Sequence, residues 1–223
     1  HAVACARYHV LSNNVGGVGV EYAEESDRKA WVRFRYPRWM YAGPTLCGVP
    51  VETSRGFLRG WYAQNGPSLG NPRLRFVCIS EDMTGQFGLC GYFEETDREL
   101  GEDERLLFAP EELPPDFARH EQPSLPEQEW SPERLEKANR NYAMEYLRNG
   151  MAALAATIGE DATREHGRRT ARLIGLQYQA ELAARLGAPD GDLANAGAFL
   201  QRLFEGMGDV VECRQADASI HLT

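Results

Sequence analysis

The sequence predicts an α+β fold: an antiparallel-sheet amino-terminal half with a short helix, then a three-helix carboxy-terminal half that ends in a β-hairpin. Two observations carry this prediction. Between residues 15 and 95, apolar and polar residues alternate in short runs separated by turn residues, as in half-buried strands. After residue 131, the apolar spacing changes to three or four residues over long stretches, as in amphipathic helices.

The first strands form a predicted β-hairpin. Residues 18–22 alternate apolar and polar side chains, residues 24–28 make a polar turn, and residues 31–36 alternate again. Because successive side chains of a strand point to opposite faces, Arg33 and Arg35 are expected on the face opposite to the aliphatic and aromatic residues Val32 and Phe34.

Residues 37–50 are broken repeatedly by proline and glycine and are predicted to form a loop. Residues 52–64 have the apolar spacing of a short amphipathic helix, and the Asn-Gly-Pro sequence at 65–67 predicts where it ends. Two further strands are expected at residues 73–78 and 87–93.

Three helices are expected in the second half. Ser131 can cap a helix that starts at Pro132, and proline is common at the first position of a helix. A second helix is predicted from about 161 to 186 and a third from about 193 to 205. The chain then ends in a hairpin over residues 210–222, with its turn placed at residues 216–217.

The charge is unevenly distributed. The formal net charge is −9, and 14 acidic residues against three basic ones lie between positions 91 and 133. Five prolines between positions 110 and 126 argue against a long helix or a central strand there. We therefore expect a sheet domain at 1–100, an acidic proline-rich connection at 101–130 and a helical domain with its terminal hairpin at 131–223. The connection is either a solvated linker or an acidic strip on which a partner subunit docks.

The composition argues against several functions. A net negative chain is a poor candidate for general nucleic-acid binding, and no run of eighteen apolar residues predicts a membrane span. The five cysteines form no Cys-x-x-Cys pair, which favours a reducing, cytoplasmic location over a disulfide framework. No cofactor or metal site is expected, since Cys213 and His221 fall on opposite faces of the predicted terminal hairpin.

A group of arginines and aromatic residues predicts a substrate pocket. Planar guanidinium groups beside aromatic rings are suited to a small anionic ligand that carries a carboxylate. The alternative is an ordinary core with a charged rim. The candidate substrate-binding residues are Arg33, Arg35, Arg38, Trp39, Trp61 and Tyr62.

Four residues are candidates for catalysis. Cys47 lies on an irregular segment close to arginines that favour a thiolate, and Cys90 lies in a strand between two glycines. Glu94 could act as a general base and His166 could move a proton near neutral pH. The alternatives are small buried thiols, a solvated strand-end carboxylate and a helix-surface histidine.

Residues 158–175 open with Ile-Gly-Glu-Asp and contain a Gly-Arg-Arg run. This pattern resembles the 2-amino-thiazoline-4-carboxylate hydrolase-like family and is also similar to 4-vinyl reductase type ligand-binding domains, over about 158–215. The first resemblance implies hydrolytic opening of a small heterocycle bearing a carboxylate, and a carboxy-terminal cysteine that corresponds here to Cys213. The second implies a small-molecule sensor or an accessory protein of a pigment pathway.

The leading hypothesis is a hydrolase-like enzyme, with a cysteine nucleophile, acting on a small carboxylate-bearing molecule held between the two halves. The alternative is a non-catalytic module that binds a small molecule or cofactor, or a subunit of a larger complex. A homo-oligomer is compatible with both.

Overall fold

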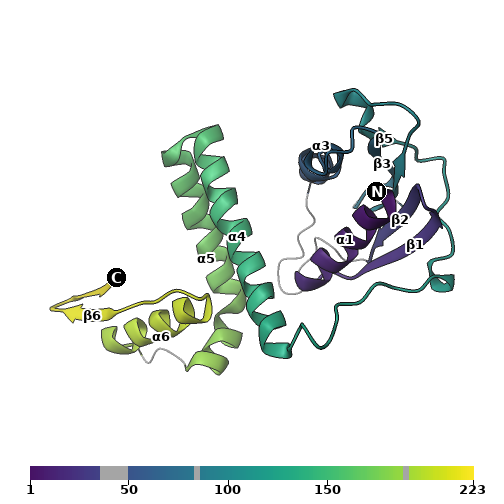
Figure 1. Cartoon of the computed structure of the whole chain (residues 1–223). Coiled ribbons are helices and arrows are strands. Elements are labelled where there is room, and N and C mark those ends of the chain that lie inside the picture. The colour runs from purple at the N-terminus through teal and green to yellow at the C-terminus, as the bar shows by residue number, and fades with distance from the viewer. Residues whose placement is uncertain (36–49, 83–85, 188–190) are drawn as a thin grey trace. The chain divides into compact units, whose positions relative to one another are not determined.

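A computed structural model describes residues 1–35, 50–82, 86–187 and 191–223. It is a mixed α+β structure, which confirms the predicted fold class, and it divides into two compact units, residues 1–135 and 136–223 (Figure 1). The acidic connection at 101–130 belongs to the first unit.

The first unit is built on a five-stranded sheet with the order β1-β2-β4-β3-β5. Neighbouring strands are antiparallel, except that β5 runs parallel to β3. The strands are β1 (Val20–Ser26), β2 (Lys29–Phe34), β3 (Leu74–Ser80), β4 (Cys90–Glu95) and β5 (Leu106–Phe108). The sequence therefore located the first four strands, and it missed the three-residue β5.

A helix that the sequence analysis did not predict, α1 (Ala2–Val15), opens this unit. The predicted helix at 52–64 is present as α2 (Val51–Phe57) followed by a π-helical segment, η1 (Leu58–Tyr62). One more helical turn, α3 (Asn65–Ser68), forms where the sequence predicted a stop. Pro67 is tolerated there because the first turn of a helix leaves its backbone N–H groups unpaired.

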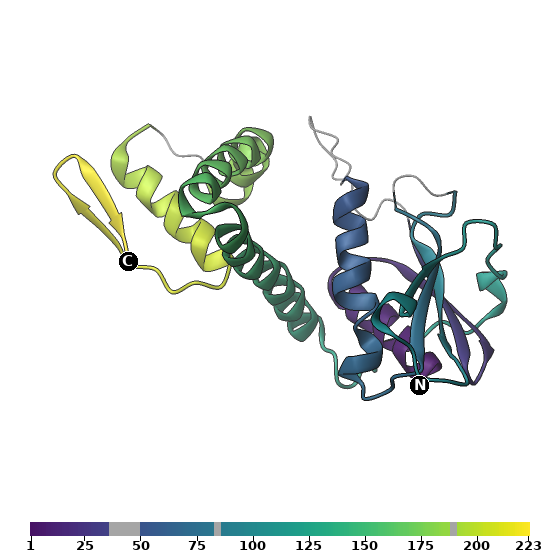
Figure 2. The same cartoon turned by 90° about the horizontal axis from the view of Figure 1, so that it is seen from above.

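Both faces of the sheet are covered. Val32, Phe76 and Phe93 point to the face that packs against α1 and η1. Trp31 and Cys90 point to the other face, which is covered by residues of the connection. Figure 2 shows α1 and the α2-η1-α3 stretch on one side of the sheet and the short 3₁₀ turn of the connection, η3 (Phe117–Arg119), on the other.

The connection also closes an edge of the sheet. β1 is an outer strand, and the backbone N–H of Tyr22 donates to Oε1 of Gln122 at 2.8 Å. Nε2 of Gln122 donates back to the Tyr22 carbonyl at 3.0 Å. One side-chain amide thus makes the pair of hydrogen bonds that a neighbouring strand would make. A second 3₁₀ turn, η2 (Glu102–Glu104), lies earlier in the connection.

The second unit contains the three predicted helices, which are confirmed. Helix α4 (Pro132–Ile158) begins just inside the first unit and runs beside α5 (Glu160–Leu186), with α6 (Leu193–Gly206) after them (Figure 1). The terminal hairpin consists of β6 (Cys213–Ala216) and β7 (Ser219–Leu222).

The predicted register of that hairpin is wrong, because the turn lies one residue later than expected. Cys213 pairs with Leu222 and Arg214 pairs with His221, which places the two-residue turn at residues 217–218. Asp217 there has a φ of 49°, a left-handed conformation that aspartate tolerates in tight turns. Cys213 and His221 still point to opposite faces, as expected from neighbouring register positions.

Within the part of the chain that the structure describes, no helix combines the length and the apolar character needed to cross a membrane.

Candidate functional site

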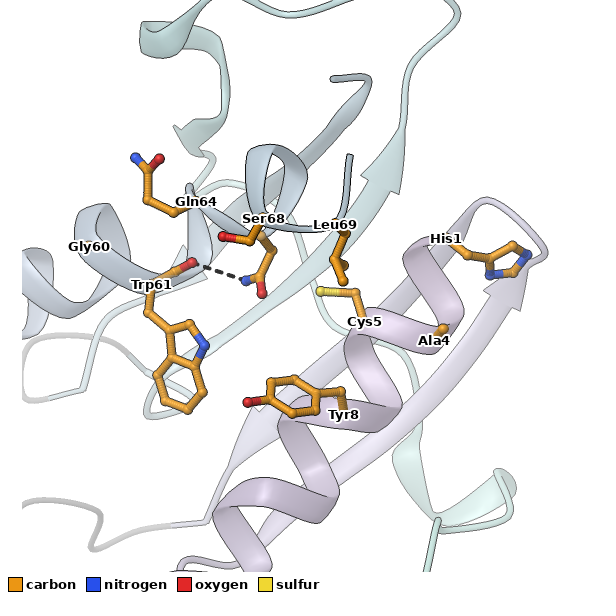
Figure 3. A pocket seen from close by; sticks show the side chains of 10 residues that line it. His1, Ala4, Cys5, Tyr8, Gly60, Trp61, Gln64, Ser68 and Leu69 are labelled. Carbon is orange, nitrogen blue, oxygen red and sulfur yellow. Dashed lines mark hydrogen bonds between the residues drawn. The ribbon is translucent and has the colours of Figure 1, made fainter. Parts of the chain in front are cut away.

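A cavity of about 550 Å³ lies inside the first unit, between α1 and the α2-η1-α3 stretch. This volume falls within the range of sites that bind small molecules. Figure 3 shows the rings of Tyr8 and Trp61 reaching toward the cavity from its two walls. The lining residues are His1, Ala4, Cys5, Tyr8, Gly60, Trp61, Gln64, Asn65, Ser68 and Leu69.

The π-helical segment shapes one wall of this cavity. The amide of Ala63 donates to the carbonyl of Leu58 at 2.9 Å, five residues back, so this turn holds one residue more than an α-helical turn. Leu58 and Tyr62 remain buried in the core, while Trp61 and Gly60 reach the cavity. A Cβ atom at Gly60 would have no atom within 4 Å, so the absence of a side chain there leaves space open.

A buried histidine lies behind the cavity wall. His9 is 0% exposed, and its ring centroid lies 4.7 Å from Trp61, 4.4 Å from Tyr62 and 4.9 Å from Phe93. Nδ2 of Asn65 lies 3.0 Å from Nε2 of His9. Because an amide nitrogen only donates, this contact requires Nε2 to accept, which fits the neutral imidazole with its proton on Nδ1.

Asn65 also fixes the wall itself. The same Nδ2 group lies 3.1 Å from the carbonyl oxygens of Trp61 and of Tyr62. Asn65 thus holds the backbone of Trp61, and packing against His9 positions the Trp61 ring. A rigid aromatic wall of this kind favours a defined ligand orientation.

The cavity is uncharged over most of its surface. None of its lining residues is Lys, Arg, Asp or Glu, and Cys5 contributes a thiol whose pKa burial raises to about 12. The nearby amino-terminal charge lowers this pKa by less than burial raises it. The lining therefore suits a neutral, largely apolar molecule better than the carboxylate that the sequence predicted.

The predicted arginine and aromatic group is divided by the sheet. Arg33 lies on the face of the connection, where its guanidinium stands 4.5 Å from the ring of Phe117, whereas Trp61 and Tyr62 pack on the opposite face. Arg33 and Trp61 therefore lie on different sides of the sheet and do not line one pocket. Two further members of the group, Arg38 and Trp39, lie outside the described residues.

The arginines that are described are already paired. Arg33 Nε lies 2.6 Å from Glu21 Oε2, and Arg35 Nη2 lies 3.4 Å from Glu21 Oε1. Burial alone would raise the pKa of Glu21, but the hydrogen bond from Arg33 and the two positive charges outweigh burial and hold the pKa below its usual value. Both guanidinium groups therefore share one carboxylate, which balances one of their two positive charges.

The candidate catalytic residues are not brought together. Cys90 is 0% exposed, and burial raises the pKa of its thiol to about 12, against a smaller opposing effect of Arg33. Glu94, on the same face of β4, forms an ion pair of 2.6 Å with Arg75. The buried thiol of Cys90, with its raised pKa, and the pairing of Glu94 with Arg75 both disfavour a nucleophilic role for Cys90.

The other two catalytic candidates are elsewhere in the sequence. His166 is exposed on α5 in the second unit, and Cys47 lies outside the described residues. Their proposed roles stay predictions.

One polar cluster had no counterpart in the sequence analysis. Arg55 of α2 makes two hydrogen bonds to Glu81 at 2.7 and 2.9 Å, and the buried Ser54 hydroxyl donates to the buried carboxylate of Asp82. These pairs tie α2 to the end of β3. Arg55 and Glu81 also line a smaller cavity of about 230 Å³.

Across residues 1–35, 50–82, 86–187 and 191–223, no three His, Cys, Asp or Glu side chains are grouped so that they could hold a metal ion. Comparison of the chain with protein-family models, with curated proteins and with solved structures finds no match.

Proposed function

We propose that this protein is a small-molecule binding module whose first unit takes up a neutral, aromatic ligand in the cavity between α1 and the α2-η1-α3 stretch. The observation that carries the proposal is the cavity itself: about 550 Å³, with a lining that contains no Lys, Arg, Asp or Glu and two aromatic rings on opposite walls. Sites of this size and polarity typically bind small molecules.

The rings of Tyr8 and Trp61 are suited to a flat ligand between them. Aromatic pairs gain stabilisation beyond the area that they bury, in offset-stacked or edge-to-face arrangements. Gln64 and Ser68 add amide and hydroxyl groups to the lining, which can orient a ligand through one or two hydrogen bonds.

A binding role fits the cysteines better than hydrolysis does. Burial raises the pKa of Cys5, Cys78 and Cys90 to about 12, so all three thiols are protonated at neutral pH. The hydrolase hypothesis stays a prediction, and of its two candidate nucleophiles it now depends on Cys47. The family resemblance, whose cysteine corresponds to Cys213, also stays a prediction.

A fluorescent probe tests the proposal. N-phenyl-1-naphthylamine is neutral and aromatic, and its emission rises in an apolar site. We expect saturable binding to the full chain, accompanied by quenching of tryptophan emission, because Trp61 lines the cavity.

Two glycines provide a matched pair of variants. Gly56 and Gly60 lie one helical turn apart, and at neither would a Cβ atom meet another atom within 4 Å. Only Gly60 lines the cavity. Gly60→Leu should therefore weaken probe binding by about tenfold or more, while Gly56→Leu should leave it within about twofold of wild type.

The proposal fails if Gly60→Leu binds the probe as wild type does, because the probe would then occupy another surface. It also fails if both variants weaken binding equally. Unchanged urea-unfolding midpoints establish that either effect is local.

A further inference from the structure

The lining of the cavity includes one polar side chain that is almost fully buried. Asn65, the first residue of α3, is 7% exposed, and Cys5, at 2%, is the other buried member of the lining. Gln64 is half-buried, and Tyr8 and Ser68 are exposed. Asn65 and Cys5 therefore form the part of the lining that solvent reaches least.

The contacts of Asn65 determine which way its amide points. Nδ2 lies 3.1 Å from the carbonyl oxygens of both Trp61 and Tyr62, and the Trp61 contact is the dashed line in Figure 3. Nδ2 also lies 3.0 Å from Nε2 of His9. The opposite orientation would place Oδ1 against two carbonyl oxygens, which only accept hydrogen bonds. The nitrogen therefore faces the core, and its two hydrogens are shared among three acceptors.

The amide oxygen of Asn65 keeps its capacity to accept. Among the residues that the structure describes, no N–H or O–H group donates to Oδ1. Buried polar atoms in proteins almost always have a hydrogen-bond partner. Because Asn65 lines the cavity and its nitrogen is directed to the core, Oδ1 is the polar atom that it offers to a ligand.

The chemistry of this acceptor restricts the ligand. An amide oxygen accepts from N–H and O–H groups, and it repels the lone pairs of a carboxylate. A charged ammonium group would lose its hydration without a carboxylate to balance it, because the lining contains no Asp or Glu. Neutral donors fit best, such as the N–H of an indole or the O–H of a phenol.

We propose that the ligand of the cavity is a neutral aromatic molecule with an N–H or O–H group, and that this group donates a hydrogen bond to Oδ1 of Asn65. This inference rests on the proposed function and adds Asn65 as the residue that determines specificity. Tyr8 and Trp61 contact the ring, while the core contacts of Asn65 hold the acceptor in one orientation. A ligand without a donor leaves a buried oxygen unpaired, which weakens its binding.

Two isomers of methylindole test the proposal. 3-Methylindole keeps the indole N–H, whereas 1-methylindole has the same formula and nearly the same size without it. Each is titrated into the full chain with N-phenyl-1-naphthylamine bound, so that loss of probe emission reports displacement. We expect 3-methylindole to displace the probe at a concentration about tenfold lower or more, because 1-methylindole leaves Oδ1 unpaired. A second pair, 2-naphthol and 2-methoxynaphthalene, makes the same comparison for an O–H donor.

Variants of the polar lining residues assign the preference to one side chain. Asn65→Ala should bring the two methylindoles to within about twofold of each other, even where a loosened wall weakens the binding of both. Ser68→Ala and Gln64→Ala are the matched controls, because each removes another polar group of the lining. Both should retain the preference. They keep the assignment testable if the urea-unfolding midpoint shows that Asn65→Ala does not fold.

The proposal about Asn65 is overturned if the probe binds and both members of each pair displace it equally well. It is also overturned if a folded Asn65→Ala keeps the preference, or if either control variant abolishes it. Failure of the proposed function gives a different result, which overturns both proposals: the probe does not bind saturably, or Gly60→Leu leaves its binding unchanged.

Discussion

Gly91, in the middle of β4, offers a sharp test of the packing between the central strands. A Cβ atom at this position would lie 2.2 Å from the carbonyl oxygen of Val77, 2.6 Å from Cζ of Phe76 and 3.1 Å from Cα of Cys78. Ordinary contacts of a Cβ atom begin near 3.4 Å. Two of these atoms belong to the backbone and the third to a fully buried ring, so none can move aside easily.

We therefore expect Gly91→Ala to lower the free energy of unfolding of the first unit by about 3 kcal/mol or more. Overpacking a core usually costs about 1 to 3 kcal/mol, and here β3 and β4 must also separate, which strains their shared hydrogen bonds. Since domains are stable by only about 5 to 15 kcal/mol, the first unit of this variant should be close to unfolding.

Tryptophan fluorescence in urea measures this effect selectively. All four tryptophans, at positions 31, 39, 61 and 130, lie in the first unit, so their emission follows that unit alone. The control is Gly56→Ala, whose new methyl group meets nothing within 4 Å and which should stabilise the helix by about 0.5 to 1 kcal/mol. A Gly91→Ala midpoint equal to that of wild type would refute the packing argument.

Two further outcomes are expected. Iodoacetamide at pH 8 should modify the half-buried Cys213 well before the buried thiols, and mass spectrometry of peptides would reveal fast labelling at Cys90 if that residue were a nucleophile. Glu21→Gln should lower the stability of the first unit by about 1 to 2 kcal/mol at pH 7, because it breaks the pair with Arg33. The pKa of Glu21 is lowered by folding, so this stabilisation exists above the unfolded pKa of about 4.3 and disappears as the pH falls through the folded value. A difference between wild type and variant that persists undiminished in acid would contradict this assignment.

The helices of the second unit were predictable because residues at their ends mark where each helix starts and stops. Ser131 and Pro132 mark the start of α4, and Gly159 and Gly187 bracket α5 with positive φ angles of 86° and 85°. Such signals depend on neighbouring residues alone.

Helix α1 also carried a signal in the sequence, although a weak one. Its buried positions are Ala2, Cys5, Ala6, His9, Val10 and Asn13, at helical spacings of three and four. Two of these six core positions hold polar side chains, which breaks the apolar pattern. His9 packs against Asn65 and four aromatic rings. The amide of Asn13 donates to the His9 carbonyl at 2.7 Å, which satisfies that polar side chain in the core.

Sequence patterns could not predict the cavity, because its walls come from segments that are far apart in the chain. The cavity joins α1 to residues about sixty positions later, and nothing local indicates that Tyr8 and Trp61 face a shared space. The sequence did predict correctly that Arg33 and Phe34 point to opposite faces of β2. It could not reveal that both faces are covered, since covering the second face depends on Phe117 in the connection.

The amide of Gln122 on the edge of β1 has a consequence for how the protein behaves at high concentration. An outer strand with free N–H and carbonyl groups can recruit a strand from another molecule and begin ordered aggregation. At Tyr22 both groups are already occupied by one side chain. The acidic segment that holds Gln122 there thus blocks this point of the sheet edge as a template, and its negative charge repels other copies of this net-negative chain.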